Sequence, residues 1–318
     1  MIESQLRLFG SSLQIKPEVI APPFSVLDAQ RGRWMARKNM WANLGLDDLR
    51  GREEKMIWKN PEILTAYGRK TELPGTSRFD PVLAELLISW FCPLAGRILD
   101  PFAGGPTRGI VAAMLGREYL GIDLSAEQID ENYSQALGLC PPALTPEWIV
   151  GDSSNLEIIL AGRPPADFIF SCPPYFDLEH YTDDPRDLST MPWPEFLAVY
   201  RRIIGHAWGA LRKDRFAAWV ISDVRDRADQ GGYRNLPGQT IDAFATAGGI
   251  LYNRAIFVTP VVTLAIRAAF SFPISRKLGM QHQEVLVFLK GSWREALKAF
   301  PRPSDGELTC AERTERSD

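Results

Sequence analysis

The chain has 318 residues, a formal net charge of −3 and a sequence pI near 5.8. This balance excludes an overall positive field that would draw the protein onto nucleic acid, so such a partner has to meet a local basic surface. Four cysteines without C-x-x-C spacing and three separate histidines predict neither a disulfide framework nor a metal site. No apolar run approaches the roughly 20 residues needed to cross a bilayer, and we expect a soluble protein of a reducing cytoplasm.

Residues 1–75 mix basic residues, tryptophans and prolines without the alternation of a strand, and residues 32–46 have the pattern of a helix. We therefore expect an accessory region here and not a second core. From residue 81 onward, short apolar runs alternate with longer helical patterns. The expected helices span residues 81–91, 107–116, 125–137, 193–211 and 238–247, and the expected strands span residues 97–102, 118–124, 147–152, 167–172, 216–224, about 251–259 and 283–290.

Strands that alternate with helices predict a Rossmann-like α/β fold, in which a doubly wound, mostly parallel sheet is covered by helices on both faces. The last two strands have no clear helix between them, so we expect them to form an antiparallel pair at one edge. The principal domain is expected to cover residues 76–292, and the polar residues 293–318 are expected to form a disordered tail.

The first candidate site follows the strand RILD, where a glycine pair separates the strand from the next helix. Ligands of open parallel sheets bind beyond the carboxyl ends of the strands, and glycine lets backbone N–H groups approach them closely. The next two strands end in aspartates, one of which is suited to bind ribose hydroxyls. An ordinary tight turn is the alternative. The candidate cofactor-binding residues are Asp100, Phe102, Ala103, Gly104, Gly105, Asp123, Leu124 and Asp152.

The nature of the cofactor follows from its charge. The turn is not the G-x-G-x-x-G of dinucleotide-binding proteins, and an aspartate at the end of the strand would repel a pyrophosphate. S-adenosylmethionine carries a sulfonium and an ammonium group, and it fits Asp100 better than a nicotinamide nucleotide does.

The second candidate site is SCPPY, residues 171–175, at the end of the strand expected over 167–172. The motifs DPFAGG, GIDL and SCPPY, in this order, resemble those of the S-adenosylmethionine-dependent DNA methyltransferases that methylate the exocyclic amine of adenine or cytosine. The resemblance extends over nearly the whole chain, most closely to a subgroup often found in phages and prophages. It implies that Pro173 and Pro174 hold a backbone carbonyl against the target amine, and that Tyr175 stacks on a base flipped out of the duplex.

The same resemblance extends to two further segments. GTSRFDP, residues 75–81, is similar to the family segment that contacts the methionine end of the cofactor, which makes Ser77, Phe79 and Asp80 candidate cofactor-binding residues. Residues 275–291 resemble the final strand of the family.

Cys172 departs from the family pattern, which has Asp, Asn or Ser at this position. A thiol accepts hydrogen bonds poorly, so three chemical interpretations are open. The carbonyl of Pro173 positions the amine and Cys172 is a tolerated substitute, or Ser171 supplies the missing oxygen, or Cys172 attacks a pyrimidine ring carbon as a nucleophile. A buried thiol without a chemical role is the fourth interpretation.

DNA contact is expected from basic segments and from the polar stretch 177–193, which could close over the target base. A solvent-exposed helix face explains the basic residues nearly as well. The candidate nucleic-acid-binding residues are Arg31, Arg33, Arg37, Lys38, His180, Tyr181, Arg276 and Lys277.

The prediction is a DNA methyltransferase that acts on the amine of cytosine or adenine in double-stranded DNA, with a slight preference for cytosine because Ser171-Cys172 is nearer to the serine-type motif. The alternatives are carbon-5 methylation through Cys172 and a DNA-binding protein that has lost catalysis. RNA as the substrate stays open, since base flipping serves either polymer.

Overall fold

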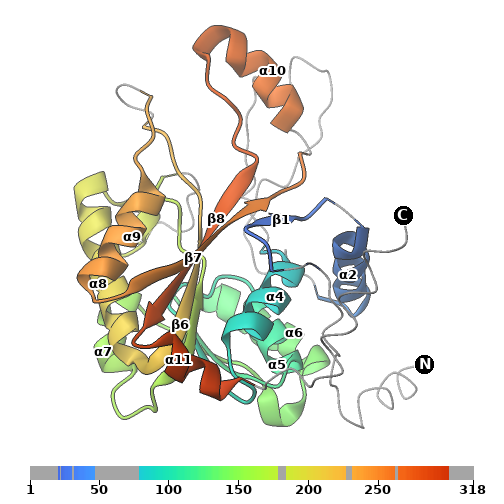
Figure 1. Ribbon diagram of the computed structural model, residues 1–318, viewed down its shortest axis with the longest axis vertical. Coiled ribbons are helices and arrows are strands. Elements are labelled where there is room, and N and C mark those ends of the chain that lie inside the picture. Colours follow the sequence, from blue (N-terminus) through green and yellow to red (C-terminus); the bar gives the residue numbers. More distant parts are fainter. Residues whose placement is uncertain are drawn as a thin grey trace.

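The computed structural model describes residues 21, 23–30, 32–46, 79–177, 184–226, 231–261 and 264–300, without the side chains of residues 266 and 267. Within these ranges the chain forms an eight-stranded sheet of order β1-β7-β8-β6-β5-β2-β3-β4 (Figure 1). The strands are β1 (Val26–Asp28), β2 (Arg97–Asp100), β3 (Glu118–Asp123), β4 (Glu147–Val150), β5 (Ala166–Ser171), β6 (Leu211–Ile221), β7 (Ile250–Val258) and β8 (His282–Lys290).

The sheet is mostly parallel, which confirms the predicted fold class. The pairs β1–β7, β2–β3, β2–β5, β3–β4 and β5–β6 are parallel, whereas β8 runs antiparallel to both β6 and β7. The last two strands therefore do pair antiparallel. The antiparallel strand itself lies inside the sheet and not at its edge, and residues 285–289 are all buried, as expected for a strand covered on both faces.

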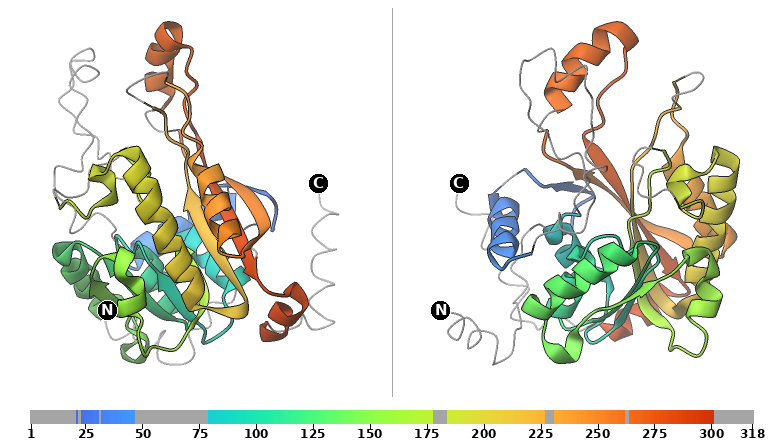
Figure 2. Two further views of the ribbon diagram at one scale, coloured as in Figure 1. Left: turned by 90° about the vertical axis from the view of Figure 1, so that its left-hand side faces the viewer. Right: turned by 180° about the vertical axis from the view of Figure 1, so that it is seen from behind.

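Helices cover both faces of the sheet. Alternate residues of the strands belong to two separate apolar clusters, so that Phe168 and Phe170 face one layer and Ile169 faces the other. The first layer contains α4 (Pro81–Phe91), α5 (Thr107–Met114) and α6 (Ala126–Leu139), and the second contains α7 (Leu156–Ile159), α8 (Trp193–Ala210) and α9 (Leu236–Thr246), as Figure 2 shows from two sides. Short 3₁₀ turns span Pro142–Leu144, Ser153–Asn155, Leu188–Thr190 and Leu297–Ala299.

The N-terminal region contributes to this same core. Strand β1 extends the sheet beside β7, although its three residues were too few to show an alternation in the sequence. Helix α2 (Gly32–Asn43) buries Trp34 and Trp41 in the cluster that also contains α4. The division into domains at residue 75 stays a prediction.

Two elements near the C-terminus were not predicted. Helix α10 (Leu264–Ser275) stands away from the body of the molecule, beyond the ends of β7 and β8 (Figures 1 and 2). Helix α11 (Trp293–Ala296) lies at the opposite end of the sheet, with Ala296 fully buried, so the predicted tail of residues 293–318 is wrong for residues 293–300. Within the described ranges, no helix is long and apolar enough to cross a membrane.

Candidate active site

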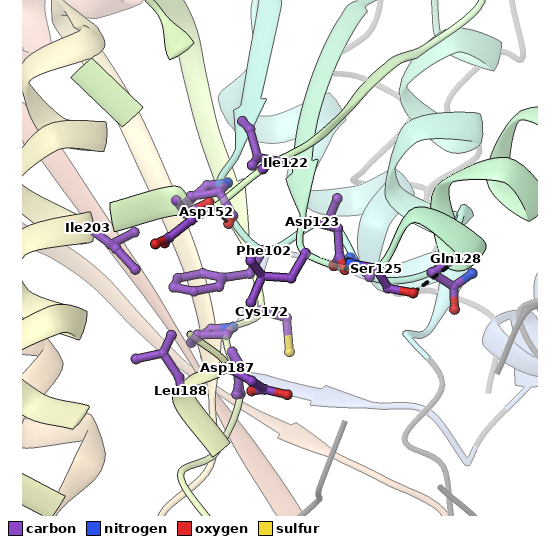
Figure 3. A pocket seen from close by; sticks show the side chains of 18 of the residues that line it. Phe102, Ile122, Asp123, Ser125, Gln128, Asp152, Cys172, Asp187, Leu188 and Ile203 are labelled. Carbon is purple, nitrogen blue, oxygen red and sulfur yellow. Dashed lines mark hydrogen bonds between the residues drawn. The ribbon is translucent and has the colours of Figure 1, made fainter. Parts of the chain in front are cut away.

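A cavity opens at the carboxyl ends of β2, β3, β4 and β5, the edge at which open parallel sheets bind ligands. Figure 3 shows Asp123, Asp152 and Cys172 around it, with the ring of Phe102 between them. The cavity brings together twelve residues that the sequence predicts for the site: Phe79, Phe102, Ala103, Gly104, Gly105, Asp123, Leu124, Asp152, Cys172, Pro173, Pro174 and Tyr175.

The glycine turn is fixed by Asp123. Gly104 has a φ of +51°, in the left-handed region that favours glycine, and its N–H donates to Oδ2 of Asp123 at 2.8 Å. Oδ1 of Asp123 accepts from the N–H of Ser125 at 2.9 Å. Burial raises the pKa of the Asp123 carboxyl, and the backbone hydrogen bonds from Ser125 and Gly104 oppose that rise. A carboxylate with both oxygens on the backbone is a rigid acceptor on the wall of the cavity.

Asp100 lies behind the cavity and does not line it. Its side chain is fully buried; Oδ2 accepts from Nε of Arg108 at 2.6 Å and from the hydroxyl of Tyr119 at 2.7 Å. Burial alone would lower the pKa of the Arg108 guanidinium, but the Asp100 carboxylate raises it above its ordinary value. The charge of Asp100 is thus compensated inside the protein, which weakens the argument that it repels a phosphate. A direct contact with a cofactor stays a prediction for Asp100 that this geometry does not favour.

Phe79 and Asp80 have different places. Phe79 lines the cavity, and the Arg108 guanidinium lies 4.6 Å from the centre of its ring. Asp80 is outside the lining: Oδ1 caps α4 by accepting from the N–H groups of Val82 and Leu83, and Oδ2 forms an ion pair with Lys38 at 2.8 Å. A direct contact of Asp80 with the cofactor stays a prediction that this geometry does not favour, because its carboxylate starts a helix and holds α2.

The side chains of Ser171, Cys172 and Tyr175 in SCPPY have different environments. The hydroxyl of Ser171 is fully buried and donates to Oδ1 of Asp100 at 2.6 Å, so it does not supply an acceptor to the cavity. Sγ of Cys172 lies in the cavity wall, 3.2 Å from the hydroxyl of Tyr175. That hydroxyl accepts from Nε2 of Gln283 at 2.9 Å, and Tyr175 is 9% exposed. Cys172 and Tyr175 therefore act as one hydrogen-bonded unit beside the two prolines.

Some of the basic residues predicted for DNA contact are paired with carboxylates inside the protein, and others are exposed. Arg37 forms a two-pronged, part-buried ion pair with Glu85, at 2.6 and 2.9 Å, so its contact with DNA stays a prediction that this geometry does not favour. Lys38 is paired with Asp80. Arg33, Arg276 and Lys277 are exposed. Four candidates lie outside the described residues: Arg31, Ser77, His180 and Tyr181.

A comparison with protein families matches the part of the chain that contains the glycine turn and Asp123. Residues 23–134 match a family model for N6/N4 methyltransferases that is described as DNA methylase. Over this segment the chain is similar to the DNA methylase family. The matched segment runs from β1 into α6, so it contains DPFAGG and GIDL, and the predicted resemblance is confirmed there. SCPPY and α10 lie outside it, and the phage subgroup stays a prediction.

The other comparisons are more distant. A search of curated proteins found no match. TrmN from Thermus thermophilus is similar in structure at 17% sequence identity, over 80% of this chain and 78% of that one, with a TM-score of 0.45. The magnesium protoporphyrin IX methyltransferase of Synechocystis PCC 6803 with bound SAM has 12% identity, 71% and 92% coverage and a TM-score of 0.43. These values are too low to transfer a substrate or a reaction to this chain.

Several residues of the site were missed in the sequence. Arg108 neutralises Asp100 from the first turns of α5, and Gln283 reaches Tyr175 from a strand 108 positions later. Arg186 and Asp187 line the cavity from the segment before α8. Only Arg108 had a sequence signal, since a cation eight residues after a buried aspartate can face it from the next helix. Among the described side chains, no group of three or more metal-binding types is close enough to hold a metal ion.

Proposed function

We propose that this protein transfers the methyl group of S-adenosylmethionine to an exocyclic amine of cytosine or adenine in double-stranded DNA. One observation carries the proposal: the glycine turn with Asp123 and the SCPPY segment line the same cavity, in a chain whose N-terminal third matches the DNA methylase family. The family match supports a methyltransferase with DNA as substrate, and the choice of the amine as the acceptor rests on SCPPY.

The residues around the cavity fit S-adenosylmethionine. Asp123 presents a carboxylate to the ribose hydroxyls, the N–H groups of the turn at Gly104 and Gly105 allow close approach, and Phe102 gives an apolar surface. Asp152 adds a second carboxylate, whose oxygens also accept from the backbone and hydroxyl of Ser154. The cofactor would supply a methyl group on a positively charged sulfur, and the cavity is lined by three aspartates, Asp123, Asp152 and Asp187, against two arginines, Arg108 and Arg186.

The chain contributes to catalysis mainly by positioning. Pro173 and Pro174 restrict the backbone, so that the carbonyl of Pro173 can accept from the target amine, and Tyr175 supplies the surface on which the base stacks. The thiol of Cys172 lies 3.2 Å from the hydroxyl of Tyr175. Cys172 precedes two prolines, whereas a nucleophilic cysteine usually follows a proline, and this order favours amine methylation over attack by Cys172 on a ring carbon.

The end of helix α10 and the residues just after it are the proposed DNA contact of the C-terminal half. Ile274 and Leu278 are 88% and 73% exposed, and Arg276 and Lys277 stand between them. Cations beside apolar side chains suit a duplex, since the cations bind phosphates and an apolar side chain can enter between base steps.

Replacing Arg276 and Lys277 together by alanine is expected to weaken DNA binding and to reduce the slope of log K against log salt by about 2. Binding titrations at several salt concentrations measure this slope. The matched control is Arg294→Ala with Lys298→Ala, at α11 and the turn after it, at the opposite end of the sheet. A slope that stays unchanged in the α10 variant, or falls equally in the control, would refute the assignment of this surface.

The function is tested by incubating the protein with methyl-labelled S-adenosylmethionine and unmodified double-stranded DNA of mixed sequence, with single-stranded DNA and RNA in parallel. The expected result is label in duplex DNA. Label in RNA alone would replace the substrate, and tight DNA binding without label in any polymer would support a binding protein that has lost catalysis.

A further inference from the structure

The antiparallel strand β8 brings its first residues beside Tyr175, a residue of the cavity wall. Because β8 runs against β6, Glu284 at its start is paired with Ile221 at the end of β6, at the edge where the parallel strands also end. Gln283 precedes Glu284 and is partly buried. A residue from the last strand of the sheet thus contacts Tyr175, which lines the cavity at the ends of the parallel strands.

The side chain of Gln283 begins a chain of hydrogen bonds. Its Nε2 donates to the hydroxyl of Tyr175 at 2.9 Å, so this oxygen acts as an acceptor. A phenol has one proton of its own to donate, and Sγ of Cys172 lies 3.2 Å away. Either the hydroxyl of Tyr175 or the thiol of Cys172 can donate in this contact, so Tyr175 links Gln283 to Cys172 in both cases.

The chain also fixes the aromatic ring. Tyr175 is 9% exposed and belongs to the apolar cluster of α8 and α9, where a hydroxyl without a partner costs free energy. With its hydroxyl held from β8 and its ring packed in the cluster, Tyr175 has one orientation at the cavity wall. We propose that Gln283 is a positioning residue for the target base: it holds the ring of Tyr175, and through it the thiol of Cys172. This inference rests on the function proposed above.

The test is a double-mutant cycle of Gln283→Leu and Tyr175→Phe in the full chain. Gln283→Leu is expected to lower kcat for methyl transfer to DNA by about 5- to 30-fold, because it leaves a buried hydroxyl without its donor, while the KM for S-adenosylmethionine is unchanged. If Gln283 acts through the Tyr175 hydroxyl, the double variant loses no more than the larger single loss. Gln283→Glu can still bond to the hydroxyl by accepting from it, and is expected to recover part of kcat.

The matched control is Gln281→Leu, two positions earlier, whose side chain reaches the carbonyl of Thr259 at 3.5 Å and not Tyr175. It is expected to keep the activity of the unchanged protein. The proposal would be overturned if the fold-losses of kcat in the two single variants multiply in the double variant. It would also be overturned if Gln283→Leu leaves kcat unchanged, or if Gln281→Leu lowers kcat as much as Gln283→Leu does.

Urea unfolding compares the four proteins of the cycle, namely the unchanged protein, Gln283→Leu, Tyr175→Phe and the double variant. This measurement does not depend on enzymatic activity. Non-additive shifts of the unfolding midpoint for Gln283→Leu and Tyr175→Phe are expected from the hydrogen bond itself. If the unchanged protein methylates no nucleic acid, the proposed function and the positioning role fail together, although the midpoints can still be non-additive. Additive midpoints in an active protein overturn the inference about Gln283 alone.

Discussion

Replacing Arg108 by alanine is expected to lower the free energy of unfolding by about 3–5 kcal/mol. The side chains of Arg108 and Asp100 are 5% and 0% exposed, and the ion pair between them measures 2.6 Å. Removing the cation leaves a carboxylate buried without its charge partner. It also takes away the donors to the carbonyls of Phe102 and Ala103, which lead into the glycine turn. Urea unfolding followed by fluorescence measures the loss.

The matched control is Arg163→Ala. Arg163 and Glu147 form a two-pronged pair at 2.8 and 2.9 Å, but their side chains are 36% and 49% exposed. Water replaces a lost partner there, so the expected cost is about 1 kcal/mol or less. Equal costs for the two variants would show that burial of the Asp100 pair does not govern the stability of the turn.

Replacing Asp123 by alanine is expected to weaken the binding of S-adenosylmethionine by about 10- to 150-fold, the value of hydrogen bonds to a charged acceptor. The alanine variant lacks the carboxylate that would accept from the ribose hydroxyls. It also lacks the acceptor that holds the N–H of Gly104. Asn, which keeps one acceptor oxygen, is expected to give an intermediate affinity. Titration calorimetry with S-adenosylmethionine and with its demethylated product measures the effect.

Asp130→Ala serves as the control for this loss of charge, because Asp130 is exposed on α6, seven positions farther along the chain. Its affinity is expected to equal that of the unchanged protein. If Asp123→Ala binds the cofactor as tightly as Asp130→Ala does, the cradle proposed around the glycine turn is wrong.

The sequence predicts the elements of the sheet well because their local signals are strong. Helix α4 has the predicted bounds, since Asp80 and Pro81 start it and Cys92-Pro93 ends it. The same Asp80 was also interpreted as a cofactor ligand, but one carboxylate serves as the cap here and is paired with Lys38. A helix-start signal and a ligand signal can consist of the same residue, and only the structure separates them.

What the sequence does not reveal depends on pairs that are distant along the chain. Arg37 is one of several similar basic residues, and nothing local indicates that it faces Glu85, 48 positions later. Gln283 and Tyr175 are 108 positions apart. Helix α10 lacks a polar face and contains Pro273, both of which argue against a helix in the sequence. Strand β1 has too few residues for a pattern.

The most direct test of the account identifies the methylated atom. The unchanged protein and Cys172→Ser are each incubated with S-adenosylmethionine and duplex DNA, and the DNA is digested to nucleosides for mass spectrometry against standards of methylated cytosine and adenine. We predict a methyl group on an exocyclic amine with both proteins, at rates within about tenfold of each other, because backbone and ring position the base. A ring-carbon product that disappears in Cys172→Ser would contradict the account and make Cys172 the nucleophile.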